Sequence, residues 1–315
     1  MTCRGMSFIL KSGVEDMDLM NVSSLDAAIR GCFGESVRIE RELRVSGGDI
    51  NDARCLFLSN AEQVFVKSNA ARRADMFAAE AAGLLAIAAT KTARTPHVLC
   101  RGVDEGLGIS FLMMEMVRSG KKAADYWEVF GRELAAMHLA DTKMLSGDGR
   151  FGFPRDNYIG STPQSNGGRN SWVDFFRDCR LVPQVKMARR YLDAAVRRRF
   201  DRLLDRLDAF LTEPDRPSLL HGDLWSGNIL PGSDGKAWLI DPAVYVGHAE
   251  ADLAMTELFG RLPERFYGAY REVNPISPDY EARRDLYNLY HLLNHLNLFG
   301  PGYYSSVVTA LRRYQ

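Results

Sequence analysis

Polar and apolar residues alternate along the first third of the chain. The alternation is regular over residues 36–45 (SVRIERELRV), and short apolar runs follow at 53–59 and 63–67. A period of two indicates β-strands, because successive side chains on a strand point to opposite faces. Two more apolar runs of strand length lie at 97–101 and 108–117. The pattern therefore predicts five antiparallel strands.

Helical spacing interrupts the strands once and then dominates the chain. Residues 72–89 are rich in alanine and carry their large apolar residues at helical spacing, so we expect one helix after the third strand. Further along, the pattern predicts helices at 126–140, 172–182, 184–211, 250–260, 263–273 and 279–296. The loop-like segment 146–171 is long for a compact domain, and such loops are often functional. We therefore expect an α+β fold of two lobes, residues 1–117 and residues 118–315.

The composition narrows the class of protein. The chain has 315 residues, 40 basic against 40 acidic side chains and 46% hydrophobic residues, which are average values for a globular protein. It lacks the basic excess typical of nucleic-acid-binding proteins. Its longest apolar stretch (81–89) is about half a membrane span, and its start does not resemble a signal peptide. Five scattered cysteines without a C-x-x-C pair suit a reducing compartment. We expect a cytoplasmic protein that binds neither nucleic acid nor membranes, and we favour a monomer.

Two short segments carry acidic and amide side chains between apolar strands. In LLHGDLWSGNIL (219–230), Asn228 follows Asp223 by five residues, and Asp241 ends the strand-like AWLID thirteen residues later. This is the spacing of a kinase catalytic loop, H-x-D-x-x-x-x-N, followed by a metal-binding Asp. An isolated H-x-D would more often be a turn with a buried His, but four elements in order favour phosphoryl transfer.

The residue types suit this chemistry. A carboxylate within hydrogen-bond reach of an alcohol can accept its proton, so we predict Asp223 as the catalytic base, with His221 bracing the loop beside it. Asn228 and Asp241 offer the oxygen ligands that Mg²⁺ prefers, and Mg²⁺ keeps several waters and needs few protein ligands. The sequence thus predicts that these two residues hold Mg²⁺ on the phosphates of ATP.

A kinase also needs upstream residues that position the nucleotide. Lys67 ends the third predicted strand and is one of only eight lysines, and Glu80 lies in the helix that follows. We predict that Lys67 binds the α- and β-phosphates of ATP while Glu80 pairs with it. The other expected nucleotide contacts come from the turn before the second strand and from the hinge after the fifth: Gly47, Gly48, Glu115 and Val117.

Whole phrases of the sequence resemble the fructosamine kinase (ketosamine kinase) family, a branch of the aminoglycoside-phosphotransferase-like kinases. The matching phrases are SGGDIN (46–51), FVKSN (65–69), GFPRDNYIGSTPQSN (152–166), LLHGDLWSGN (219–228), DPAVYVGHAEADLAMTELFG (241–260) and LYHLLNHLNLFGPGY (289–303). The resemblance implies a bilobal, protein-kinase-like fold and an ATP-dependent kinase for a sugar hydroxyl of ketosamines. These are ribulosamine and fructosamine adducts of small amines or of protein lysines. The phosphorylated adduct then releases the amine, so the activity amounts to deglycation, a form of protein repair.

The resemblance also implies roles for residues outside the spacing argument. Asp252 would anchor the backbone of the catalytic loop, although an ordinary Asp at a helix N-terminus is an alternative. Trp225, Asn157 and His295 would contact the acceptor, and the alternative for Trp225 is a place in the core of the lobe. This chain lacks the redox-active Cys that some family members carry in the Gly-rich loop, and Ala249 stands where the family often has Arg.

Two other functions are compatible with the same motifs. The first is a small-molecule kinase for an aminoglycoside, choline or a related amino alcohol. Aminoglycosides would require a strongly acidic cleft, whereas arginines balance aspartates in the segment 146–171. The second is a nucleotide-binding pseudokinase that serves as a scaffold. The five intact catalytic positions argue against it.

Overall fold

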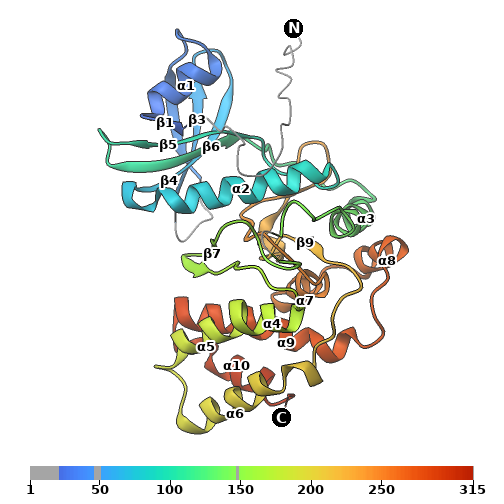
Figure 1. Cartoon of the computed structure of the whole chain (residues 1–315). Coiled ribbons are helices and arrows are strands. Elements are labelled where there is room, and N and C mark those ends of the chain that lie inside the picture. The colour runs from blue at the N-terminus through green and yellow to red at the C-terminus, as the bar shows by residue number, and fades with distance from the viewer. Residues whose placement is uncertain (1–20, 46–50, 147–148, 315) are drawn as a thin grey trace.

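The computed structural model describes residues 21–45, 51–146 and 149–314 (Figure 1). A six-stranded sheet forms most of the first third, and most of the remainder is helical. The strands are β1 (Asn21–Val22), β2 (Ile39–Arg44), β3 (Asp52–Leu58), β4 (Gln63–Ala70), β5 (Val98–Asp104), β6 (Ile109–Glu115), β7 (Asn157–Ile159), β8 (Thr162–Gln164), β9 (Ser218–Leu220), β10 (Ile229–Pro231), β11 (Ala237–Leu239) and β12 (Tyr245–Gly247). The helices are α1 (Leu25–Phe33), α2 (Ala74–Thr90), α3 (Tyr126–His138), α4 (Trp172–Phe175), α5 (Val182–Ala188), α6 (Ala194–Asp205), α7 (Glu250–Leu258), α8 (Glu264–Val273), α9 (Tyr280–Phe299) and α10 (Tyr304–Leu311). The expected two-lobed α+β architecture is confirmed.

The sheet differs from the prediction by one strand. Its order is β1-β5-β6-β4-β3-β2, with six strands instead of the five antiparallel strands that the pattern predicts. The added strand, β1, runs parallel to β5 and places Asn21 opposite Arg101. Two residues are too few to show an alternating pattern, so the sequence does not reveal β1. Helix α1, which follows it, begins at the cap residue Ser24, whose Oγ accepts a hydrogen bond from the amide of Ala27 at 3.1 Å.

Helix α2 lies between the sheet and the helical lobe (Figure 1). Its Phe77, Ala81 and Leu84 pack in one apolar cluster with residues of β5 and β6. Ala86 and Ile87, one turn further along, belong to the core of the helical lobe. Both lobes therefore bury α2, which explains why its sequence is apolar on most sides.

The charged segment 184–211 forms two helices, although the pattern predicts one. Helix α6 begins at a cap of its own, where Asp193 Oδ1 accepts hydrogen bonds from the amides of Ala195 and Val196, each at 2.8 Å. Charged residues continue at helical spacing on both sides of this cap. The pattern therefore hides the break, and the cap residue alone marks it.

The helix predicted at 172–182 does not end at residue 182, because its helical course continues into α5. Between α4 and α5 the chain makes a π-helical turn over Phe176–Leu181. Pro183 stands at the beginning of α5 and has no N–H to donate into the preceding turn. The π-helical turn connects α4 directly to α5, so the helical course from Trp172 to Ala188 is continuous.

The other predicted elements are present, with ends shifted by a few residues. Strand β6 ends before residue 117, and α3 begins after it. The sequence predicts the boundary between the lobes at this residue, and that boundary stays a prediction. The long segment 146–171 contains the short hairpin β7–β8. Among the residues that the structure describes, no helix is long and apolar enough to cross a membrane.

Candidate active site

Two short ladders hold the segment with the predicted catalytic residues. Strand β9 pairs with β12 and β10 pairs with β11, so the loop from His221 to Asn228, here called the catalytic loop, leaves one ladder and enters the other. The amide of Ala243 donates to His221 O at 2.8 Å, and the amide of Ile240 donates to Asn228 O at 3.1 Å. The segment after β11 is thus hydrogen-bonded to both ends of the catalytic loop.

Asp223 lies partly buried in the catalytic loop, and Asn228 fixes it. The side-chain amide of Asn228 donates to the backbone O of Asp223 at 2.8 Å and to its Oδ2 at 3.2 Å. Burial raises the pKa of Asp223 to about 7. The hydrogen bond from Asn228 opposes this rise, and the charges of Asp241 and Asp252 add to it. A carboxylate with this pKa can accept a proton from an alcohol near neutral pH.

Asp252, in helix α7, binds the backbone of the catalytic loop. Its carboxylate accepts hydrogen bonds from the amides of His221 at 2.7 Å and Gly222 at 2.9 Å, and His138 Nε2 lies 3.2 Å from it. The residue is only 1% exposed. Burial acts to raise its pKa, but the hydrogen bonds and the neighbouring histidines hold the pKa of Asp252 below its usual value. This buried anion therefore fastens two consecutive loop amides.

Gly222 and His221 explain why the motif begins with HGD. Gly222 has φ +80°, and a Cβ there would lie 2.1 Å from the O of Ala243, so only glycine can occupy the position. His221 is buried, with Nε2 donating to Ile240 O at 2.9 Å and Nδ1 accepting from the amide of Asp223 at 3.3 Å. Burial also lowers the pKa of His221, which keeps it neutral. Both ring nitrogens hold the loop, as the predicted bracing role requires.

Lys67 brings the two lobes together at the predicted nucleotide site. Its Nζ lies 2.6 Å from Glu80 Oε1 on α2, and it also forms an ion pair with Asp241. Burial acts to lower the pKa of Lys67, but the two carboxylates raise it above its usual value, so the ammonium stays charged. The Asp241 side chain is 41% exposed and forms the open side of this cluster.

Asp241 and Asn228 supply the oxygens expected of a magnesium site. Asp241 has φ +55°, a left-handed conformation that is uncommon outside glycine and that clusters at functional sites. The amide nitrogen of Asn228 donates to Asp223, and no hydrogen bond among the described residues involves the Oδ1 of Asn228. A carboxylate and an amide oxygen are both hard ligands, so the donor chemistry is suitable for Mg²⁺.

The remaining predicted nucleotide contacts lie at the end of β6, in the segment that follows it, and in a turn outside the described residues. The amide of Glu115 donates to His97 O at 2.8 Å, and its carboxylate accepts from the amide of His97 at 3.2 Å. Val117 lies in the segment between β6 and α3. Gly47 and Gly48 fall outside the residues that the structure describes. The contacts of these residues with the nucleotide stay predictions.

A buried polar network fixes the hairpin β7–β8. Asn157 Nδ2 donates to Val244 O at 2.7 Å, and its Oδ1 accepts from Gln164 Nε2 at 2.7 Å. Gln164 also donates to Ala243 O at 3.0 Å and accepts from the hydroxyl of Tyr290 at 2.6 Å. Asn157 therefore holds the hairpin against the segment after β11 and has its polar groups engaged with protein. The sequence analysis missed Gln164 and Tyr290, since neither stands at a spacing with chemical meaning.

A row of aromatic side chains begins at the catalytic loop. Ring centroids are 6.2 Å apart for Trp225 and Phe259, 4.7 Å for Phe259 and His295, and 5.4 and 5.1 Å from His295 to Phe299 and Tyr303. Trp225 is 38% exposed and Phe299 53%, so Trp225 does not lie in the core of the lobe. Burial lowers the pKa of His295 below its usual value. We call these five residues the aromatic row; Phe259 is a member that the sequence analysis missed.

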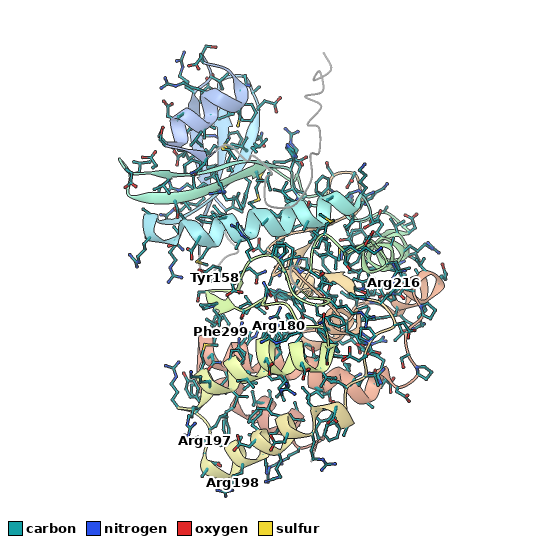
Figure 2. All side chains as sticks on the ribbon, viewed as in Figure 1. Tyr158, Arg180, Arg197, Arg198, Arg216 and Phe299 are labelled. Carbon is teal, nitrogen blue, oxygen red and sulfur yellow. The ribbon has the colours of Figure 1, made fainter. Side chains whose placement is uncertain are left out.

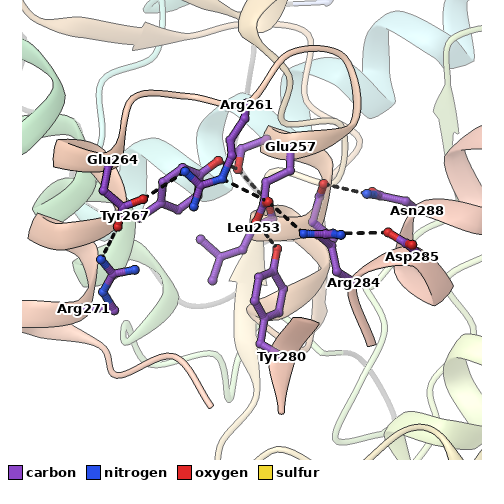
Figure 3. Close-up of polar contacts among 12 residues, drawn as sticks. Leu253, Glu257, Arg261, Glu264, Tyr267, Arg271, Tyr280, Arg284, Asp285 and Asn288 are labelled. Atoms are coloured by element: carbon purple, nitrogen blue, oxygen red, sulfur yellow. Dashed lines mark hydrogen bonds and ion pairs between the residues drawn. The ribbon is translucent and has the colours of Figure 1, made fainter. Parts of the chain in front are cut away.

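The helix that presents Asp252 is itself fastened at its far end (Figure 3). Glu257 accepts hydrogen bonds from the hydroxyl of Tyr280 at 2.8 Å and from Arg284 Nη1 at 3.3 Å, both on α9. Arg261 Nε, just beyond α7, lies 3.2 Å from the same carboxylate. These contacts limit the motion of α7 and so of the anchor that it carries.

Known proteins resemble this chain over nearly its full length. The family model described as fructosamine kinase matches residues 22–315. A Synechocystis protein named "Probable ketoamine kinase" is 42% identical over 285 residues, which cover 89% of this chain and 92% of that protein. The Arabidopsis thaliana "Protein-ribulosamine 3-kinase, chloroplastic" is 41% identical over 283 residues, or 89% of this chain and 84% of that one. A crystal structure from Thermobifida fusca, assigned to the fructosamine-3-kinases, superposes with a TM-score of 0.78 at 34% identity and covers 93% of this chain and 99% of its own. The chain belongs to the fructosamine kinase family.

Proposed function

We propose that the protein is an ATP- and Mg²⁺-dependent kinase that phosphorylates a sugar hydroxyl of ketosamines, ribulosamines above all. Membership of the fructosamine kinase family supports a ketosamine as the acceptor, and the Arabidopsis relative is named as a ribulosamine kinase. One observation carries the proposal. Asp223, with its pKa raised to about 7, is held by Asn228 within the electrostatic reach of Asp241, which pairs with Lys67.

Asp223 takes the role of the base. The acceptor oxygen forms a bond to the γ-phosphorus of ATP while the bond from that phosphorus to the β–γ bridging oxygen breaks, which releases ADP. The proton of the acceptor hydroxyl passes to the carboxylate of Asp223. Asn228 holds Oδ2 of this carboxylate at 3.2 Å, which leaves Oδ1 to receive the proton.

Lys67 changes one of its partners when the nucleotide binds. In the structure, its ammonium pairs with Glu80 and Asp241. We assign Lys67 to the α- and β-phosphates, with Glu80 retained and the Asp241 carboxylate released. Mg²⁺ held by Asp241 and by Oδ1 of Asn228 would neutralise charge on the β- and γ-phosphates. The exchange replaces one anion beside Lys67 with another, so the buried ammonium never lacks a counter-charge.

The aromatic row is the proposed acceptor face. A ketosamine presents the C–H groups of its sugar and a protonated amine, and aromatic faces suit both. Trp225 stands two residues after Asp223, which puts an exposed ring next to the base. Burial lowers the pKa of His295, which favours the neutral imidazole beside the amine. Asn157 supports this face indirectly through the hairpin.

A ketosamine acceptor has two forms, a free adduct or an adduct on a protein lysine. An exposed row of rings can accept either, because its far end at Phe299 is open. Action as a monomer and a cytoplasmic location stay predictions from the sequence. Release of the amine from the phosphorylated sugar would make the reaction a deglycation step.

The test is an acceptor panel with mapping of the phosphate position. The purified protein is given MgATP with ribulosamine and fructosamine derivatives of Nα-acetyl-lysine, with an aminoglycoside and with choline, and ADP release and the NMR spectrum of the product are recorded. We expect turnover with the ketosamines, loss of turnover on chelation of Mg²⁺, and a kcat lowered about 100- to 10,000-fold in Asp223→Asn. Turnover of the aminoglycoside or choline alone would replace the acceptor. ATP binding without turnover of any acceptor would indicate a pseudokinase.

A further inference from the structure

The hairpin β7–β8 contacts helix α2 as well as the catalytic segment. Tyr158, which Figure 2 shows between α2 and the helical lobe, donates its hydroxyl hydrogen to the carboxylate of Asp75 at the beginning of α2. Arg155 Nη1 donates to Ala78 O at 3.3 Å. The hydrogen bond to Asp75 is the main reason that the pKa of Tyr158 is raised to about 12, so the hydroxyl remains a donor throughout the physiological range. These contacts join the two lobes at the surface.

The opposite face of the same hairpin reaches the segment that follows the metal ligand Asp241. Asn157 donates to Val244 O, and Gln164 donates to Ala243 O. Neighbouring side chains on a strand point to opposite faces, so Asn157 and Tyr158 necessarily face different partners. The hairpin is therefore clamped between the catalytic segment on one side and α2 on the other.

Helix α2 carries Glu80, which holds Lys67 at 2.6 Å. The helix also rests directly on the segment after β11, because a Cβ at Gly83 would lie 3.1 Å from Val244 Cγ2 and 3.3 Å from Pro242 Cγ. A displacement of the beginning of α2 would therefore change the distance between Glu80 and Lys67. The contacts of Tyr158 and Arg155 act on that end of the helix.

We propose that Tyr158 and Asp75 are positioning residues that couple the acceptor side to the nucleotide side. An acceptor that steadies the hairpin steadies α2 through the hydroxyl–carboxylate contact, and α2 in turn keeps Glu80 on Lys67. Linkage requires the effect to be reciprocal, so bound nucleotide steadies the hairpin by the same factor. The inference rests on the proposed function in one respect, namely that the hairpin borders the acceptor site.

The first experiment needs no acceptor. Amide hydrogen exchange is measured in the full-length protein with and without AMP-PNP and Mg²⁺. We expect the nucleotide analogue to slow exchange in residues 157–164, and we expect Tyr158→Phe to lose most of that protection while keeping the ring. Equal exchange in the hairpin with and without the analogue would overturn the coupling.

The second experiment measures the coupling factor itself. The Kd of AMP-PNP is determined by calorimetry in the absence and presence of a saturating ribulosamine of Nα-acetyl-lysine. We expect the acceptor to tighten nucleotide binding about three- to tenfold in the wild type, the range that one hydrogen bond to an exposed carboxylate can supply, and hardly at all in Tyr158→Phe or Asp75→Ala. The double variant should behave like either single variant. A wild-type ratio of one, or an unchanged ratio in Tyr158→Phe, would contradict the proposal.

A matched control separates coupling from general loosening. Tyr304 makes the same kind of contact with Asp193, at 3.3 Å, between α10 and α6 at the far end of the helical lobe (Figure 1). Tyr304→Phe should leave both readouts at the wild-type values. The two hypotheses fail separately: ketosamine turnover without nucleotide-dependent protection of the hairpin removes the coupling alone, and protection without ketosamine turnover removes the proposed function alone.

Discussion

The catalytic loop and the aromatic row meet at Trp225, yet they are built in opposite ways. The loop is held by buried polar contacts: Asp252 is 1% exposed, His221 uses both ring nitrogens, and Gly222 has no room for a side chain. The row consists of rings that contact one another and reach 53% exposure at Phe299. We infer that the loop fixes the chemistry, whereas the row, as the proposed acceptor face, can change without disturbing the loop.

We expect the largest loss of stability and activity from a substitution of Gly222, because the loop has no room for a side chain there. In Gly222→Ala the new Cβ would lie 2.1 Å from Ala243 O, and the residue would keep a left-handed φ of +80°. We expect a loss of about 3–5 kcal/mol in the free energy of unfolding and at least about a hundredfold loss of kcat. Chemical denaturation and steady-state kinetics measure both.

Gly108→Ala is the control for the backbone strain alone. Gly108 also has a positive φ, +66°, but nothing lies within 4 Å of its Cβ position. We expect about 1–2 kcal/mol of destabilisation and a normal kcat. If Gly222→Ala behaved like Gly108→Ala, the close approach to Ala243 would not constrain the loop.

The second-largest effect is expected when Asp252, which anchors the catalytic loop, loses its charge. In Asp252→Asn one amide oxygen must serve the two backbone amides of His221 and Gly222, and the new NH₂ group has no acceptor among these donors. An unsatisfied buried donor costs about 1–3 kcal/mol, so we expect that loss of stability and about a 10- to 100-fold lower kcat. Asp285→Asn, which disrupts ion pairs with Arg284 and Arg313, should change stability by about 1 kcal/mol or less and leave kcat intact. Equal effects of the two variants would remove Asp252 from its anchoring role.

The sequence predicts the loop well because the information is local. His221, Asp223, Asn228 and Asp241 stand at fixed separations in one segment, and short apolar strands frame them. Lys67 could be found for a similar reason, since a charged residue at the end of an apolar strand stands out. The five-strand prediction failed only at β1, where two residues leave no period to detect.

The proposed acceptor side is much harder to predict, because its contacts join distant parts of the chain. Gln164 bonds to Ala243 and to Tyr290, which are 79 and 126 residues away, and no spacing within one segment records such pairs. Asn157 could be singled out only by resemblance, and the structure gives it a supporting position inside the hairpin. Phe259 looks in the sequence like any apolar residue after a helix. Long-range packing, and not local pattern, assembles this region.

The dependence on pH should separate the two regions, because the loop contains a group that titrates near neutrality. Burial raises the pKa of Asp223 to about 7, and a protonated Asp223 cannot accept a proton. We therefore expect kcat/KM for the acceptor to fall severalfold below pH 7 and to level off above it. Burial lowers the pKa of His295 below its usual value, so a step from the row would lie at lower pH than the step from Asp223. A flat profile of kcat/KM between pH 5.5 and 8 would contradict the assignment of Asp223.

Whereas kcat/KM should rise with pH, the stability of the fold should fall as the pH rises through the same region. The folded protein retains the proton of Asp223 up to about pH 7, whereas an unfolded Asp loses it near pH 4. Because the folded state binds more protons between these values, the contribution of Asp223 to the free energy of unfolding decreases as the pH rises through this window. Asp223→Asn removes the decrease, so this variant should gain stability relative to the wild type from pH 5 to pH 8, measured by urea denaturation.

The smallest effect is expected from the row, and it should fall on the acceptor alone. Trp225→Ala removes an exposed ring that makes one ring contact, so we expect the KM of the acceptor to rise about tenfold, with the KM of ATP and the free energy of unfolding nearly unchanged. Phe299→Ala, at the open end of the row, should raise the same KM less than about threefold. The indole of Trp225 lies over Gly227, where a Cβ would come within 2.3 Å of Cζ2, so Gly227→Ala should displace the ring and reproduce the Trp225→Ala phenotype. If Trp225→Ala instead lowered kcat at saturating acceptor as much as Asp252→Asn does, the row would belong to the catalytic machinery, and the separation between the two regions would not hold.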